Sequence, residues 1–121
     1  MAIVRGSNDS YWWDVRHQVP VDNGKRLTVG FTARFKRLDK DRVADVMASI
    51  TDEDGPRIQD AELVEEVLIG WKNVLELELE DGSEPSFDDP DQRHWVLGII
   101  GMEAAVVRAW MDSIAGGRRK N

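Results

Sequence analysis

The sequence predicts an α+β protein, in which an N-terminal antiparallel β-hairpin packs on a C-terminal region of three to four α-helices. The first third alternates apolar and polar residues with a period of two, which is typical of strands with one buried side. From residue 39 onward, most apolar residues recur three and four positions apart, which is typical of amphipathic helices. We expect a loose lead-in over 1–10 and one domain over 11–121, with the hairpin at 11–38, the helical region at 39–117 and a basic tail at 118–121.

The hairpin has the clearest pattern. One predicted strand places on a single face Trp13, Val15, His17, Val19 and Val21. The other places on its buried face Leu27, Val29, Phe31, Ala33 and Phe35. Asn23 and Gly24 between the strands can supply the positive φ angles of a tight turn. Pro20 cannot donate to a ladder, so the first strand lies at an edge or ends there. His17 on a strand face indicates a core or rim residue rather than a metal ligand.

Two helices are predicted next. The first follows Asp39 as N-cap, and its apolar stripe is Val43, Val46, Met47 and Ile50. The sequence "TDEDGPR" at 51–57 breaks the chain. The second helix follows Asp60 as N-cap and runs to Trp71, with the stripe Leu63, Val64, Val67, Leu68 and Trp71.

The segment 74–80 changes period, because leucines at 75, 77 and 79 alternate with glutamates. Alternation favours a short strand, while Leu and Glu both favour helix intrinsically, so both assignments stay open. A helix then begins with Asp89 as N-cap, Pro90 as first residue and Gln92 completing a capping box. Its stripe is Trp95, Val96, Ile99 and Ile100. A further stripe holds Met102, Ala105, Val106, Ala109, Trp110 and Ile114. Gly98 and Gly101 leave open one kinked helix or two.

No motif for catalysis, cofactor binding or metal binding is found. The chain has no cysteine, which excludes disulfides and thiolate chemistry. The "DEDG" at 52–55 fails as a calcium loop at both its first and its twelfth position. The glycine pairs lack the phosphate-loop lysine, and no serine lies in a nucleophile-elbow sequence. No apolar run approaches the roughly 18 residues of a membrane span, and the N-terminus shows no signal-peptide core. We expect a non-enzymatic protein without cofactor or membrane contact.

The net charge of −7 is unevenly distributed. Residues 1–38 hold seven Lys or Arg against three Asp or Glu, whereas 39–112 hold six against twenty. Such an acidic region forms solvated helix faces or a surface that attracts a basic partner. Phe31 and Phe35 share the buried strand face, away from Arg34 and Lys36, so they are not expected to be stacking platforms for nucleic acid.

The tryptophans divide into two groups. Trp71, Trp95 and Trp110 each lie on an apolar stripe, which favours core packing. Trp12 has the opposite strand phase to Trp13, so one of the two is expected to be exposed. An exposed Trp12 beside Tyr11 would be a suitable contact anchor for a partner protein.

The order of short motifs resembles the tail assembly chaperones of long, flexible-tailed phages and prophages. These motifs are "FTARFKRLD" at the hairpin end, "GW" at Gly70 and Trp71, the "EDG" turn followed by Phe87, and the terminal "AGGRRKN". The step from Trp71 to the acidic turn is longer here than is typical of the family. Our candidate partner-binding residues are Tyr11, Trp12, Trp71 and Phe87, of which the last two belong to these motifs.

The resemblance implies a chaperone that binds the largely helical tape measure protein, keeps it soluble and helps recruit the major tail protein. Such a protein acts in the cytoplasm of the host bacterium and is absent from the mature virion. The sequence leaves open whether the chain also forms a homo-oligomer. The main alternative from the sequence is a structural tail or head–tail connector component that stays in the particle.

The final residues Lys120 and Asn121 are also accounted for by the resemblance. Family members are often made in two lengths, the longer through a −1 ribosomal frameshift near the end of the shorter frame. Lys-Asn can be encoded by codons that complete a slippery heptamer, so the resemblance implies a longer, frameshifted form as a further partner. The charges of Arg118 and Arg119 need no such explanation, because cations favour a helix C-terminus.

Overall fold

The computed structural model describes residues 9–51 and 59–115. Most of the predicted lead-in, the break after residue 51 and the basic tail with Lys120 and Asn121 lie outside this part of the chain. The elements in order are β1 (Ser10–Pro20), the short 3-10 helix η1 (Asp22–Gly24), β2 (Arg26–Lys36), α1 (Lys40–Thr51), α2 (Asp60–Val67), β3 (Leu68–Leu75), α3 (Pro90–Leu97) and α4 (Met102–Ile114). The predicted α+β class, with a hairpin followed by helices, is confirmed.

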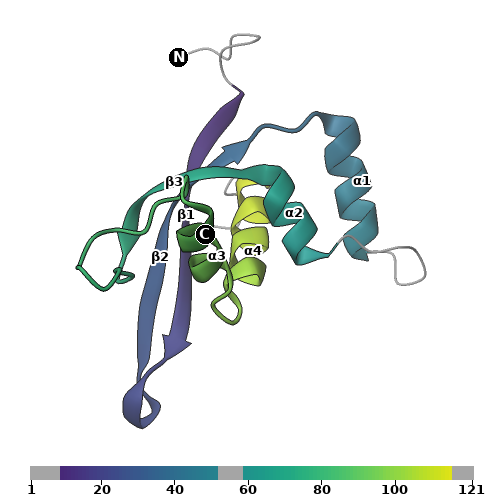
Figure 1. The fold of residues 1–121 in the computed structure, drawn as a ribbon. Coiled ribbons are helices and arrows are strands. Elements are labelled where there is room, and N and C mark those ends of the chain that lie inside the picture. Colours follow the sequence, from purple (N-terminus) through teal and green to yellow (C-terminus); the bar gives the residue numbers. More distant parts are fainter. Residues whose placement is uncertain (1–8, 52–58, 116–121) are drawn as a thin grey trace.

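The sheet is antiparallel, with the order β1-β2-β3 (Figure 1). In β1 and β2, the register pairs Val15 with Phe31 and extends along the whole length of both strands. At the turn Asn23 has φ 62° and Gly24 φ 76°, as predicted from the sequence. The tip of this hairpin projects beyond the helices (Figure 1). There Val21 and Leu27 are exposed, so their predicted burial is wrong.

The third strand corrects the sequence prediction for residues 60–80. The helix predicted to reach Trp71 ends at Val67, and Leu68 already has extended backbone angles. The chain pairs there with β2, because β2 would otherwise leave a row of backbone donors and acceptors unpaired beside a buried face. The strand then ends at Leu75, where Glu76 turns the backbone with φ 59°. The strand favoured over 74–80 therefore lies earlier in the chain, at 68–75.

Helices α2, α3 and α4 lie on one face of the sheet, with α1 to the side next to α2, and the core fills the space between helices and sheet (Figure 1). Apart from Leu27 at the hairpin tip, the inward row of β2 is buried, and α2 and α4 add their apolar stripes to it. The buried core residues are Val15, Val29, Phe31, Ala33, Phe35, Val46, Leu63, Val64, Val67, Leu68, Trp71, Val96, Met102, Ala105, Val106, Val107, Ala109 and Trp110. Among the described residues no polar or charged side chain is buried, so the core has no ionisable group that would suggest catalysis.

Helix capping follows the sequence at two of three predicted sites. Asp39 accepts a hydrogen bond from the Arg42 amide at 2.9 Å, and Asp89 caps α3 with Pro90 as its first residue. The second helix is capped by Gln59 in a capping box with Glu62, and not by Asp60. Gln92 does not complete the expected box.

The Gln92 side chain instead joins the segment before α3 to the helix. Its Nε2 donates to a carboxylate oxygen of Asp89, at 3.2 Å. Its Oε1 accepts a hydrogen bond from the Ser86 amide, at 2.7 Å. The side chain therefore stabilises the approach to α3 rather than the free amides of its first turn.

The last two helices are separate, which settles the alternative of one kinked helix. Gly101 precedes α4 with φ 85°, and the Cβ of any other residue there would lie 2.7 Å from the His17 ring. The His17 Nε2 donates a hydrogen bond to the Ile100 carbonyl oxygen at 2.9 Å. His17 therefore fastens β1 to the α3–α4 connection, in agreement with its prediction as a packed residue. Ile100 itself is 92% exposed, so its predicted place on a buried stripe is wrong.

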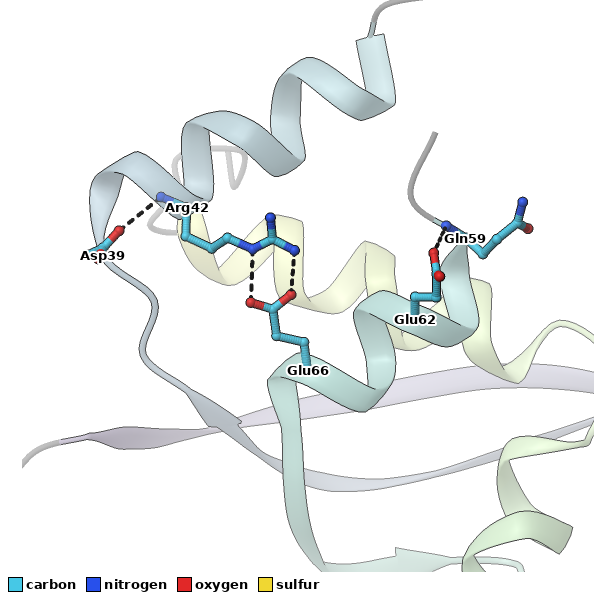
Figure 2. A network of polar contacts seen from close by, with 5 residues as sticks. All are labelled: Asp39, Arg42, Gln59, Glu62 and Glu66. Atoms are coloured by element: carbon cyan, nitrogen blue, oxygen red, sulfur yellow. Dashed lines mark hydrogen bonds and ion pairs between the residues drawn. The ribbon is translucent and has the colours of Figure 1, made fainter. Parts of the chain in front are cut away.

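Helix α1 is joined to α2 by a two-pronged ion pair (Figure 2). The Arg42 Nε and Nη2 donate to the two Glu66 carboxylate oxygens at 2.9 and 2.8 Å. Hydrogen bonding to Arg42 lowers the pKa of Glu66 below its ordinary value of 4.5. Val46 of α1 is fully buried and belongs to the hydrophobic core.

We expect Glu66→Gln to weaken the acid sensitivity of folding. A carboxyl group whose pKa is lowered by folding adds stability above its unfolded pKa and loses it as the pH falls. The free energy of unfolding of the wild type should therefore fall below about pH 4.5 more steeply than that of the variant. Asp81, whose pKa is also lowered, by its hydrogen bonds with Ser83, keeps its own contribution in both proteins. Urea unfolding at a series of pH values measures the difference, and parallel curves would contradict the expectation.

Candidate functional site

Tyr11 is the first of the four predicted partner-binding residues, and its side chain makes contacts within the fold. Its ring packs edge-on against Phe35, with the ring centroids 5.9 Å apart. Its hydroxyl lies 2.7 Å from the Ser113 Oγ, and Ser113 donates its own proton to the Trp110 carbonyl. The Tyr11 hydroxyl is therefore the donor, and it joins β1 to α4.

Trp71 and Phe87 form an aromatic cluster with Phe31 on the inner side of the sheet. The ring centroids of Phe31 and Trp71 are 4.8 Å apart, and those of Trp71 and Phe87 are 5.1 Å apart. The Trp71 indole donates a hydrogen bond to the Pro85 carbonyl oxygen at 3.0 Å. Trp71 is only 9% exposed, so its main role is to hold the segment before α3 against the sheet.

Trp12 is the predicted contact residue that the structure leaves in solvent. It lies on the sheet face opposite the helices and is 44% exposed. The Lys72 Nζ lies 4.2 Å from its ring centroid, and the Arg34 guanidinium carbon lies 5.8 Å away. The expectation that one of Trp12 and Trp13 is exposed is confirmed, since Trp13 is half-buried.

Three of the four predicted residues line one hollow at the edge of the sheet, here called the sheet hollow. It has a volume of about 330 Å³ and is lined by Trp12, Arg34, Gly70, Trp71, Glu84, Pro85, Ser86, Phe87 and Asp88. Tyr11 does not contribute to it. The hollow exists because Gly70 places no side chain beside Arg34 in the outward row of the sheet.

A larger groove lies between α2, α3 and the start of β3, here called the helix groove. It has a volume of about 570 Å³ and is lined by Ala61, Val64, Glu65, Leu68, Ile69, Phe87, Pro90, Arg93, His94, Leu97 and Glu103. Its apolar side chains come from both helices, and Ile69 is 42% exposed. Phe87 lines both this groove and the sheet hollow.

Two carboxylates and one guanidinium line the helix groove, which leaves it a small net negative charge. Glu65 and Glu103 line it from α2 and α4. The Arg93 guanidinium donates to the Phe87 carbonyl oxygen at 2.8 Å and lies 4.9 Å from the Phe87 ring centroid. Arg93 thus holds the groove wall in place, and the two glutamates remain to interact with a visiting cation.

Sequence analysis missed the exposed apolar residues of this region, above all Trp95. It was assigned to a buried stripe and is 44% exposed. The signal that could have found it is the length of α3, which Pro90 and Gly98 restrict to eight residues. Val96 is the buried residue of this helix, and neighbouring helical positions differ by about 100° in direction. Trp95 therefore points away from the core.

The described residues show little that would suggest reaction chemistry. No group of three His, Cys, Asp or Glu side chains among residues 9–51 and 59–115 is arranged to hold a metal ion. Every buried polar side-chain atom in the same ranges has a hydrogen-bond partner. In the part of the chain that is described, no helix has the length and apolar character to cross a bilayer. Among the described residues, the sheet hollow, the helix groove and the exposed aromatic side chains are the features from which we argue a function.

Comparison with protein-family models, curated proteins and solved structures finds no match for this chain. Its function must therefore be argued from these surfaces.

Proposed function

We propose that this protein is a phage tail assembly chaperone, which binds the tape measure protein in the host cytoplasm and helps recruit the major tail protein. The observation that carries the proposal is the helix groove, an apolar concave surface with an acidic rim. It adds a physical site to the sequence resemblance. No catalytic step is proposed.

The groove has the shape and chemistry for an amphipathic helix. Helices bind in apolar grooves through side chains spaced three, four and seven positions apart. Val64, Leu68 and Leu97 supply an apolar floor, and the exposed Ile69 extends it at the opening. A tape measure protein is largely helical, and its unassembled helices would expose such apolar stripes to water.

The acidic rim adds a preference for the partner's charge. Glu65 and Glu103 favour a helix that carries Lys or Arg beside its apolar stripe. The many other acidic side chains keep a complex negatively charged, which opposes its aggregation. A chaperone for an aggregation-prone helical protein requires both properties.

We expect co-expression with the tape measure protein encoded beside its gene to raise the soluble yield of that protein, and the two to co-purify. Ile69→Glu should reduce the co-purified amount by about tenfold or more, because a charge would enter an apolar contact beside Glu65. Ile114→Glu is the matched control, since Ile114 is 41% exposed against 42% for Ile69 and lies outside the groove. If both variants lost the same amount of co-purified tape measure protein, the helix groove would not be the binding site. Absence of co-purification with the wild type would contradict the proposed function.

The two candidate functions predict different compositions of the finished particle, because a chaperone is absent from it and a structural component is retained. Mass spectrometry of purified virions should detect the major tail protein and fail to detect this chain. If this chain were detected at a fixed stoichiometry, the chaperone proposal would be wrong and a tail or head–tail connector component would be the better assignment.

A further inference from the structure

The outward face of the sheet combines an exposed tryptophan with cations from all three strands. Trp12 and Arg16 come from β1, Arg34 from β2 and Lys72 from β3. The register places Trp12 opposite Arg34, and Lys72 opposite Thr32 in the next row. We call these four residues, Trp12, Arg16, Arg34 and Lys72, the basic sheet face. Helices α2, α3 and α4 lie on the other side of the sheet (Figure 1).

The basic sheet face stands out against the charge of the whole chain, which is −7. Among the cations lies the Asp14 carboxylate, which already accepts a hydrogen bond from Thr32 at 2.8 Å and lies 3.9 Å from Arg16. Glu84 and Asp88 adjoin the face at the sheet hollow, beside Trp12 and Arg34, so Lys72 and Arg16 lie on its more basic side. Cations gathered on one face of an acidic protein attract an anionic partner to that face. The indole of Trp12 adds an apolar contact of the kind that anchors protein interfaces.

We propose that the basic sheet face binds a short acidic polypeptide segment of a partner protein, with an apolar side chain against Trp12 and carboxylates on Lys72 and Arg34. The occupant is argued from charge complementarity. This surface is separate from the helix groove, and the proposal does not depend on the chaperone function.

Two observations favour a polypeptide over a nucleic acid. Glu84 and Asp88 line the adjoining sheet hollow and would repel a continuous phosphate backbone. The net charge of −7 opposes a long polyanion more strongly than a segment with a few carboxylates.

A peptide titration tests the proposal on the full chain. The probe is Glu-Glu-Leu-Leu-Glu-Glu amide, added up to millimolar concentration at neutral pH and low salt, and followed in amide NMR spectra of the protein. We expect the Trp12 indole signal, identified by its loss in Trp12→Ala, to shift together with the amides of Arg34 and Lys72. Raised ionic strength should reduce the shifts, because exposed charges are screened.

Matched charge reversals separate this face from the rest of the surface. Lys72→Glu should weaken peptide binding by about tenfold, while Arg108→Glu makes the same charge change on the exposed side of α4 and should leave binding nearly unchanged. Equal effects of the two variants, or no shift of Trp12 with the wild type, would overturn the proposal. So would tighter binding of a thymidine oligonucleotide of the same net charge, which would assign the face to nucleic acid.

Discussion

Gly30→Ala is expected to destabilise the fold by about 3 kcal/mol, because there is no space for a side chain at this position. A Cβ built on Gly30 would lie 2.0 Å from the Val15 carbonyl oxygen and 3.0 Å from its carbonyl carbon. Both are backbone atoms of β1, so no side chain can rotate away to relieve the clash. The two strands would have to separate where Val15 and Phe31 pack into the core. Thermal unfolding should show the midpoint lowered by about 10–15 °C.

Gly70→Ala is the matched control for this prediction. Gly70 is also a strand residue, and its added Cβ would lie 3.7 Å from the Arg34 Cβ, which is an ordinary contact. Glycine within a strand costs conformational entropy relative to alanine, so we expect a change within about 0.5 kcal/mol of zero or a slight gain. If the two alanine variants unfolded at the same temperature, the close approach at Gly30 would be disproved.

Trp71→Ala is expected to cost about 3–5 kcal/mol, because it removes a large buried ring between Phe31 and Phe87. It also leaves the Pro85 carbonyl oxygen without the indole donor. Trp71→Phe retains most of the packing and should cost about 1 kcal/mol for the lost hydrogen bond, together with the smaller ring. Urea unfolding of both variants measures the difference.

Trp12→Ala provides the comparison within the same set of predicted partner-binding residues. Trp12 is 44% exposed, and its ring contacts the cations of Arg34 and Lys72, so its loss should cost no more than about 1 kcal/mol. The two substitutions should therefore have different effects: Trp71→Ala should reduce the stability of the fold, and Trp12→Ala should weaken peptide binding. If Trp71→Ala were as stable as the wild type, Trp71 would not be needed for folding and would again be a candidate for partner binding.

Local sequence patterns were sufficient where neighbouring residues alone decide the conformation. The alternation of residues 11–36 with Asn23 and Gly24 between the strands predicted the hairpin, and the Asp39 and Asp89 caps follow from side chains that bond amides two or three residues away. The exposure of one tryptophan in the pair Trp12 and Trp13 follows from the same alternation. These features depend on contacts within a few residues.

The helix-to-strand change at Leu68 shows where such patterns are insufficient. Leu63, Val64, Val67, Leu68 and Trp71 have helical spacing, yet the last two lie in β3. The pairing of Gly70 with Arg34 and of Trp71 with Ala33 is a long-range gain, which outweighs a local helix preference of at most a few tenths of a kcal/mol per residue. The sequence spacing contains no information about an unpaired edge on β2.

The same distinction between local patterns and long-range contacts applies to the candidate site. The sequence by itself determined the α+β class, the hairpin and its two faces, and the lack of thiol chemistry, because composition and period are local properties. Only the tertiary structure decided that Trp71 is buried, that Trp95 is exposed, and that α2, α3 and β3 enclose a groove with an acidic rim. The physical reason is that burial and concavity arise between elements distant in the chain, where packing and strand pairing outweigh the preferences of each segment.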